Sequence, residues 1–217
     1  WEHPGNLAVA PMVTKAAFTW KDFEPVAIGA KGDTALIVRG DSPFKTAQKK
    51  LDAIKAEPGK YRWCLALNAV SHFTFLNISH ALGGLKATFI PANGDKGRIV
   101  SLLGGNSDIT TVGYASVVPY PQSGHLRILA MVNTERSPFA PDVPTLKEQG
   151  VDASYDFLYT VFAPKGTPQE DVQILTGAFQ KTLAKPETVE ALKQQSLTPF
   201  YRNPEETRKL WQAESDL

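Results

Sequence analysis

Short apolar runs recur along the chain, separated by glycine, proline and polar residues. Runs of this length are typical of strands that a sheet buries on both faces. They predict strands at Val26–Ile28, Ala35–Val38, Trp63–Ala66, Ala87–Ile90, Ile109–Val112, Leu126–Val132 and Leu158–Ala163.

Between these runs the apolar residues recur at helical spacing, and prolines mark several helix starts. Ser42, Thr167 and Asn203 each precede a proline, as a capping side chain precedes the first helical residue. Thr167 and Glu170 also have the spacing of a capping box. We therefore expect helices from Pro43 to before Pro58, over Ser71–Leu82, Asp95–Leu103 and Ala115–Gln122, from Pro168 to Lys185, over Glu187–Gln195 and from Pro204. Strands that alternate with helices predict an α/β protein whose sheets are mainly parallel and flanked by helices.

The composition narrows the possible partners. The 217 residues include 23 Lys and Arg against 22 Asp and Glu, a net charge of +1. This balance gives no electrostatic footprint for nucleic acid or for an anionic membrane. The single cysteine, Cys64, excludes an internal disulfide framework and a cysteine-rich zinc module.

Motifs for catalysis, metals and cofactors are weak. The chain has no Gly-x-Ser-x-Gly elbow and no glycine-rich phosphate loop, so no nucleotide or other cofactor is expected. Ser71 and His72 are neighbours in a predicted helix, where adjacent side chains point apart, and Ser71 is better explained as a helix cap than as a nucleophile. The four histidines lack metal-ligand spacing, and Asp108 and Asp142 are the carboxylates nearest to strand ends.

Three joints between a predicted strand and the next helix point to anion binding. The carboxyl ends of parallel strands meet at one edge of a sheet, where the N–H groups of the following helices favour an anion such as a carboxylate. The joints contribute Asn68, Ser71 and His72, then Asn93 and Gly94, and then Thr111 and Tyr114. Every α/β protein has such loops, so this geometry favours a ligand site and ordinary loops about equally.

Several motifs, spread in order over nearly the whole chain, together resemble one known family. The more specific ones are Pro141-Asp142-Val143-Pro144-Thr145 and Ala163-Pro164-Lys165-Gly166-Thr167-Pro168, and shorter ones include Ile90-Pro91, Leu102-Leu103-Gly104-Gly105 and Gly124-His125-Leu126-Arg127. In this order they are similar to the extracytoplasmic substrate-binding receptors of tripartite tricarboxylate transporters, often called Bug receptors.

The resemblance implies a two-lobed periplasmic binding protein fold, type II-like, that closes on its ligand. Residues 36–130 would form one lobe, and residues 1–35 with 131–217 the other, which would contribute Tyr159 and Thr160 to the site. Such a protein is not an enzyme and needs no cofactor. It would be a periplasmic monomer that binds a small organic acid and delivers it to the permease subunits of the membrane transporter.

The sequence departs from the family pattern in ways that affect the ligand. The family begins with a strand and a glycine-rich loop that forms one wall of the cleft, and we expect this chain, which opens at Trp1, to lack that segment and to have an incomplete first lobe. Cys64, Leu67 and Val70 stand where the first joint is commonly rich in glycine and serine. Such side chains keep an anion away from the backbone, and they indicate a ligand with an apolar body or a weakened site.

Two other hypotheses belong to different classes of protein. The same two-lobed fold serves as the ligand-sensing domain of regulatory and signalling proteins. A helix-turn-helix upstream of Trp1 would favour a regulator, and a signal peptide there would favour a receptor. An enzyme is a weaker hypothesis, since it depends only on Ser71, His72 and Asp108.

Overall fold

The computed structural model describes residues 18–215, and the chain divides into two compact units. Unit 1 comprises the described residues up to Gly32, Asn68–Val70 and the chain from Phe157 onward. Unit 2 comprises Asp33–Leu67 and Ser71–Asp156. The start of the expected first lobe, residues 1–17, lies outside the described residues.

The compact units divide the chain at other points than the expected lobes. Residues 131–156, expected to join the chain ends, belong to unit 2. They are hydrogen-bonded to one another there, with Tyr155 N donating to Val132 O at 2.8 Å and Asn133 Nδ2 donating to Asp156 Oδ1 at 3.0 Å. The main divisions between the compact units thus fall after residues 32 and 156, with the short segment 68–70 also assigned to unit 1, and the lobe boundaries at 35 and 130 stay a prediction.

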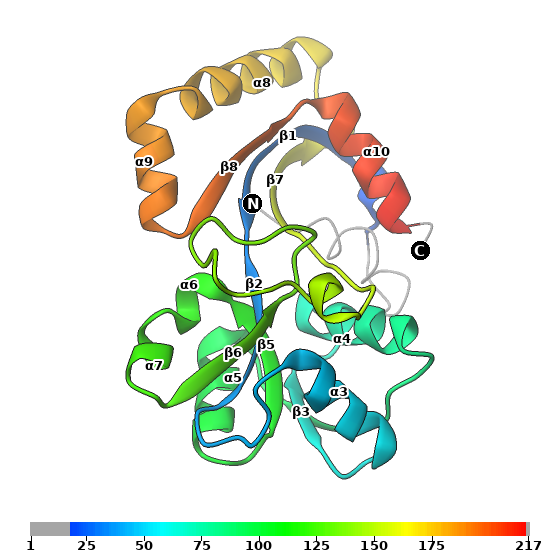
Figure 1. Ribbon diagram of the computed structural model, residues 1–217. Helices are drawn as coiled ribbons and strands as arrows, with labels where there is room; N and C mark the ends of the chain where they lie inside the picture. The colour runs from blue at the N-terminus through cyan, green and yellow to red at the C-terminus, as the bar shows by residue number, and fades with distance from the viewer. Residues whose placement is uncertain (1–17, 216–217) are drawn as a thin grey trace. The chain divides into compact units, whose positions relative to one another are not determined.

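Unit 2 is built around a five-stranded sheet in the order β4-β3-β5-β2-β6, of which β2, β3, β5 and β6 are labelled in Figure 1. Its strands are β2 (Thr34–Arg39), β3 (Arg62–Leu65), β4 (Thr88–Pro91), β5 (Ile109–Gly113) and β6 (Leu126–Met131). β3 pairs in parallel with β4 and β5, whereas β2 pairs antiparallel with β5 and β6. The expected parallel pairing therefore holds for the part of the sheet that carries the three joints.

Helices cover both faces of this sheet, and alternate residues of β2 serve the two faces. α3 (Ala47–Ala56) and α4 (Val70–Ala81) pack with Leu36 and Val38. α5 (Gly94–Leu103) and α6 (Tyr114–Val117) pack with Ala35 and Ile37. Successive side chains of a strand point to opposite faces, so this alternation is the pattern of a strand buried on both. The remaining helices of unit 2 are α7 (Pro119–Gln122) and η2 (Lys147–Gln149).

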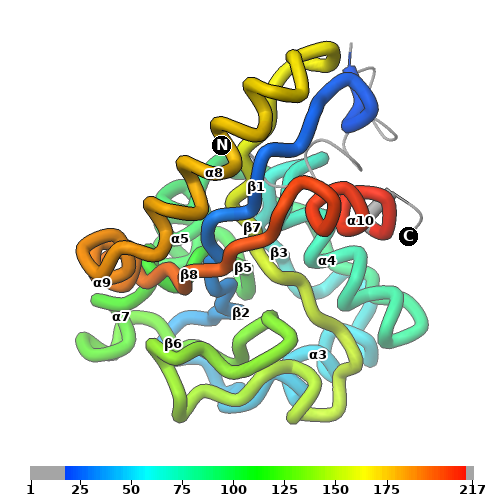
Figure 2. The backbone as a smooth tube through the Cα atoms, turned by 90° about the horizontal axis from the view of Figure 1, so that it is seen from above, coloured from blue at the N-terminus to red at the C-terminus, as the bar shows by residue number. Residues whose placement is uncertain are grey.

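Unit 1 has a three-stranded sheet in which β1 lies between β7 and β8 (Figure 2). Its strands are β1 (Phe23–Gly32), β7 (Phe157–Pro164) and β8 (Leu197–Arg202). All of them pair antiparallel, so the expectation of a mainly parallel sheet is wrong for this unit.

The helices of unit 1 pack against this sheet. α8 (Gln169–Leu183) and α10 (Pro204–Ser215) contact β1, and α9 (Pro186–Gln194) contacts β8. The short helix η1 (Trp20–Asp22) sets Trp20 against Trp211 of α10, with ring centroids 6.5 Å apart. No helix in the described part of the chain is long and apolar enough to cross a membrane.

The hydrophobic pattern does not predict β8, because Pro199 interrupts it. Proline has no N–H to donate to a neighbouring strand, so within sheets it is largely confined to edge strands. β8 is such an edge strand, with Pro199 opposite Ala30 of β1.

The predicted helix caps have mixed outcomes. Asn203 caps α10 as predicted, since its Oδ1 accepts a hydrogen bond from Glu206 N at 3.0 Å. The cap at Ser42 is wrong, because α3 begins later and is capped by Thr46. The capping box at Thr167 is also wrong, because its hydroxyl donates to Pro164 O at 2.7 Å instead.

Candidate functional site

The carboxyl ends of β3, β4 and β5 lie side by side at one edge of the sheet of unit 2. β3 pairs in parallel with both neighbours, with Leu65 opposite Pro91 and Cys64 opposite Thr110. The three strands are followed by α4, α5 and α6. The predicted joints therefore gather at this edge, as the parallel pairing requires.

At the first joint, Ser71 closes the loop rather than capping the helix. α4 begins at Val70, so the predicted role of Ser71 as N-cap is wrong. Ser71 is buried, and its Oγ accepts a hydrogen bond from Ala66 N at 2.9 Å. Asn68 has φ 58°, a left-handed conformation that asparagine tolerates better than most residues. The first turn of α4 carries no acidic side chain, so its positive end is not neutralised from within that turn.

His72 is half-buried beside aromatic rings. Its ring lies 5.7 Å from the ring of Phe89 in an edge-to-face arrangement and stacks at 6.3 Å on Phe73. Loss of hydration lowers the pKa of His72 below its usual value. The imidazole is therefore mainly neutral at pH 7, and it would meet an anion as a hydrogen-bond donor rather than as a cation.

The second joint exposes Asn93 and Gly94 at the start of α5. Asn93 is the N-cap residue, but its side chain makes no capping hydrogen bond. Gly94 has φ +66°, and although no atom would crowd a Cβ there, a residue with a side chain would strain this left-handed backbone. The joint thus presents an amide side chain and a backbone conformation that glycine adopts without strain.

Asp95 and Arg98 connect the second joint to the third, and the sequence pattern does not predict this connection. The Asp95 carboxylate accepts hydrogen bonds from Gly113 N at 2.8 Å and from Ser116 Oγ at 2.9 Å, and it pairs with Arg98. Arg98 Nε in turn donates to Thr111 O at 3.0 Å. The available signal was the spacing of three residues between Asp95 and Arg98 on one helix face, but it does not reveal a partner 18 residues away.

The third joint places Thr111 and Tyr114 differently. Thr111 is buried, and its Oγ1 has no hydrogen-bond partner among the described residues. Tyr114 donates its hydroxyl hydrogen to Phe139 O at 2.9 Å, and burial raises the pKa of this phenol. Tyr114 is therefore held by the fold, whereas Thr111 keeps a hydroxyl with unused bonding capacity.

The other three predicted contacts, Asn68, Tyr159 and Thr160, belong to unit 1. Tyr159 and Thr160 lie on β7, where Thr160 pairs with Ile28 of β1. Thr160 resembles Thr111, because its buried Oγ1 also lacks a partner among the described residues. A buried hydroxyl without a partner is uncommon and calls for an explanation such as a ligand or a water molecule.

The residues that an enzyme hypothesis would combine are not assembled. Ser71 follows the carboxyl end of β3, whereas Asp108 precedes the amino end of the parallel strand β5. Asp108 accepts hydrogen bonds from Arg62 N at 2.8 Å and from the Arg62 guanidinium. Ser71 and His72 therefore lie at one end of the sheet and Asp108 at the other, where Asp108 is bound to Arg62.

The sequence matches a family of transport receptors over nearly its whole length. The sequence model of the tripartite tricarboxylate transporter family receptor, TctC, matches residues 4–216. The chain is 33% identical to the UPF0065 protein in the gbd 5′ region of Cupriavidus necator, over 79% of this chain and 52% of that protein. It is 30% identical to protein BugT of Bordetella pertussis, over 87% of this chain and 58% of BugT. The chain thus spans about half to three fifths of the length of these relatives.

Solved structures share the fold. A TctC solute binding protein from Polaromonas is 28% identical, with a TM-score of 0.79 over 97% of this chain and 73% of that one. The periplasmic binding protein BugD is 26% identical, with a TM-score of 0.82 over 99% of this chain and 73% of BugD. MatC from Rhodopseudomonas palustris, solved with bound malate, is 24% identical and shares the fold, with a TM-score of 0.84 over 99% of this chain and 75% of MatC. This chain therefore has the two-lobed α/β fold of these periplasmic binding proteins and belongs to the tripartite tricarboxylate transporter receptor family.

Proposed function

We propose that this chain binds a small carboxylated organic acid outside the cytoplasm and delivers it to the permease subunits of a membrane transporter. Family membership supports a receptor rather than a catalyst. The observation that carries the ligand class is the edge of unit 2 where β3, β4 and β5 end. There the N-terminus of α4 lacks an acidic side chain, and the neighbouring joints supply Asn93, Gly94 and the hydroxyl of Thr111.

The charges at this edge favour recognition by dipoles. The Arg98 guanidinium is already paired with Asp95, and His72 is mainly neutral at pH 7. Backbone N–H groups at a helix N-terminus hold an anion without a cationic side chain, and a carboxylate accepts several such bonds. MatC, which has the same fold, was solved with malate, so the fold accommodates a carboxylate. Asn68, Tyr159 and Thr160 stay predicted contacts of the ligand.

A thermal unfolding screen of the chain against organic acids tests the ligand class. A ligand that binds only the folded state stabilises it by about 2.7 kcal/mol at 100 times its dissociation constant. We expect such a shift for one or more carboxylates and none for the corresponding uncharged amides, which keep the shape but lose the charge. Equal shifts for acid and amide, or shifts only for solutes without a carboxylate, would contradict the proposal.

Replacing Thr111 with valine is expected to weaken carboxylate binding about tenfold without loss of stability. The substitution removes a buried hydroxyl that has no partner among the described residues, so the described fold loses no hydrogen bond, whereas the ligand loses one. Titration calorimetry with the acid found in the screen measures the affinity, and urea unfolding measures the stability.

The adjacent residue provides a matched control with the opposite result. Thr110 Oγ1 donates to Cys64 O at 2.7 Å inside the sheet. Thr110→Val should therefore cost about 1 kcal/mol of stability and leave the affinity unchanged. A Thr111→Val protein that binds the acid as tightly as the original would remove Thr111 from the site.

Delivery to a transporter needs a separate experiment. In the source cells, if they take up the identified acid, deletion of the gene for this chain should abolish uptake, and the original protein should restore it. The Thr111→Val protein should restore uptake only at higher acid concentration, in proportion to its lost affinity. Normal uptake after deletion would contradict the transport role while leaving the binding result intact.

A further inference from the structure

A pocket lies in unit 2, at the end of β3 and β5 opposite to the candidate site. Arg62 is the first residue of β3 and Asp108 directly precedes β5, and both line the pocket. The pocket therefore lies at the amino ends of the strands whose carboxyl ends form the candidate site. Its volume of about 400 Å³ lies in the range of small-molecule sites.

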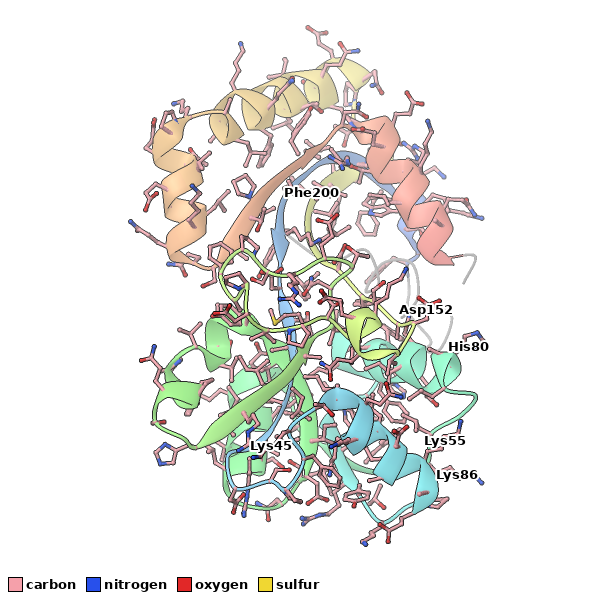
Figure 3. All side chains as sticks on the ribbon, viewed as in Figure 1. Lys45, Lys55, His80, Lys86, Asp152 and Phe200 are labelled. Atoms are coloured by element: carbon pink, nitrogen blue, oxygen red, sulfur yellow. The ribbon has the colours of Figure 1, made fainter. Side chains whose placement is uncertain are left out.

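Lys50 on α3 is the residue that distinguishes this pocket from an ordinary surface hollow. Lys50 is 2% exposed, whereas Lys55 and Lys86 of the same unit are exposed at the surface (Figure 3). Its Nζ lies 3.8 Å from the centre of the Tyr61 ring and 4.7 Å from that of Phe44. It makes no hydrogen bond or ion pair with any described residue. A buried ammonium without an anionic partner is unfavourable, and burial accordingly lowers the pKa of Lys50 to about 8.

The other charges that line the pocket are already paired. Arg62 binds Asp108 through Nε at 3.1 Å and through Nη2 at 2.8 Å. Arg39 binds Asp41, with Nε 2.9 Å from Oδ1. Among the described residues that line the pocket, three cations and two carboxylates leave one positive charge, and the unpaired cation is Lys50. A singly charged anion would complete this balance.

The loop that carries Phe44 is held in place by Arg127. Arg127 Nη1 donates to Ser42 O at 2.8 Å and to Phe44 O at 3.2 Å, and its Nη2 donates to Gly40 O at 2.8 Å. Three hydrogen bonds from one guanidinium fix the backbone of this loop. The wall of the pocket is therefore formed before a ligand arrives, which lowers the entropic cost of binding.

We propose that this pocket binds a small monocarboxylate, with the carboxylate on the Lys50 ammonium and an apolar body beside Phe44 and Tyr61. A phosphate fits less well, because it carries more than one negative charge near neutral pH and both guanidiniums already have bidentate partners. The site is separate from the edge proposed for transport, and it does not depend on that function.

Benzoate, a planar monocarboxylate, provides the test in the full chain. Nuclear magnetic resonance should show benzoate-dependent shifts at the backbone amides of residues 42, 44 and 105–108. The Lys50 Cε resonance should titrate at a higher pH with benzoate than with chloride at equal ionic strength, because a bound anion favours the ammonium. The groups that line the pocket around Lys50 and can contribute to this titration are Arg39, Asp41, Tyr61, Arg62 and Asp108.

A pair of lysine variants separates this site from general charge effects. Lys50→Met should weaken benzoate binding about tenfold or more, since it removes a charge-assisted contact and keeps the length of the side chain. Lys49→Met removes an exposed lysine next to it on α3 and should leave the affinity unchanged. Benzyl alcohol, which has a similar shape and no charge, should bind far more weakly.

Several results would overturn the proposal. Equal benzoate affinity in the two lysine variants, or shifts confined to the carboxyl-end edge of the sheet, would exclude this pocket as the benzoate site. Phosphate binding as tight as that of benzoate would exclude the monocarboxylate class. If the Lys50→Met chain does not fold, the original chain still decides, because an unchanged Lys50 titration in saturating benzoate would rule out contact with its ammonium.

Discussion

Replacing Lys50 with methionine is expected to stabilise the protein at pH 7 by about 2 kcal/mol. Burial lowers the pKa of Lys50 from 10.5 to about 8, and the negative charge of Asp108 raises it by a smaller amount. Such a difference corresponds to a cost of about 3 kcal/mol for burying the ammonium. Its cation–π contacts with Tyr61 and Phe44 offset about 1 kcal/mol of this cost. Methionine fills similar space and carries no charge.

The stability gained by the Lys50→Met substitution should decrease as the pH rises above about 8. Below pH 8 Lys50 is charged in both the folded and the unfolded chain, so the cost of burial is fully present. Between about pH 8 and 10.5 the folded chain has released the proton that the unfolded chain still holds, and the original protein becomes more stable as the pH rises.

Urea unfolding from pH 7 to pH 10.5 measures this dependence. The advantage of the Lys50→Met protein should shrink toward zero or below as the pH approaches 10.5. Lys49→Met is the matched control, because Lys49 is exposed and its replacement should change the stability little at any pH. A Lys50→Met protein that is less stable at pH 7 would mean that Lys50 contributes to the fold rather than costing it.

Trp63→Ala is expected to destabilise unit 2 by about 3–5 kcal/mol, the usual cost of truncating a buried aromatic side chain. Trp63 is fully buried in β3, and its ring meets that of Phe75 edge to face, with centroids 4.9 Å apart. It belongs to the core that α3 and α4 form on one face of the sheet. The loss should therefore affect both ends of β3, where the candidate carboxylate site and the Lys50 pocket lie.

Far-ultraviolet circular dichroism during urea unfolding measures the loss, and two further variants define its cause. Trp63→Phe should cost less, because it keeps a ring and removes an indole N–H that has no partner among the described residues. Leu76→Ala on α4 should change the stability little, since Leu76 is 46% exposed. If Trp63→Ala and Leu76→Ala had similar stabilities, Trp63 would not be a core residue of unit 2.

The sequence pattern predicted much of the fold because it records local geometry. Residues 35–38 form an unbroken apolar run, which is typical of a strand buried on both faces, and in the structure Leu36 and Val38 pack on one face and Ala35 and Ile37 on the other. The apolar stripe of α3 runs through Ala47, and Lys50 lies three residues further along the same helix face. This spacing places Lys50 on the buried face of α3, so it could have indicated that Lys50 is buried. A lysine is rarely buried, however, and the hydrophobic pattern alone did not indicate it.

The candidate site was predicted in part for the same reason. Ser71 and Asn93 follow the ends of two predicted strands, and Thr111 lies near the end of a third, so the parallel pairing of β3 with its neighbours brings them to one edge. The bridge from Asp95 to Gly113 and Ser116 escaped prediction, because a hydrogen bond between distant segments leaves no periodic signal in either of them.

For this chain, the amino-acid sequence alone determined most of the segments that form strands and helices, the joints proposed for the anion site, and the family to which the protein belongs. Those features depend on residues that are close together in the sequence or on short motifs, and both can be recognised in the sequence without the tertiary structure. The antiparallel pairing of β1, the edge position of β8 and the burial of Lys50 between Tyr61 and Phe44 were decided only in the tertiary structure. Strand partners and pocket walls come from segments far apart in the chain, and an apolar run has the same pattern whichever direction its neighbour takes.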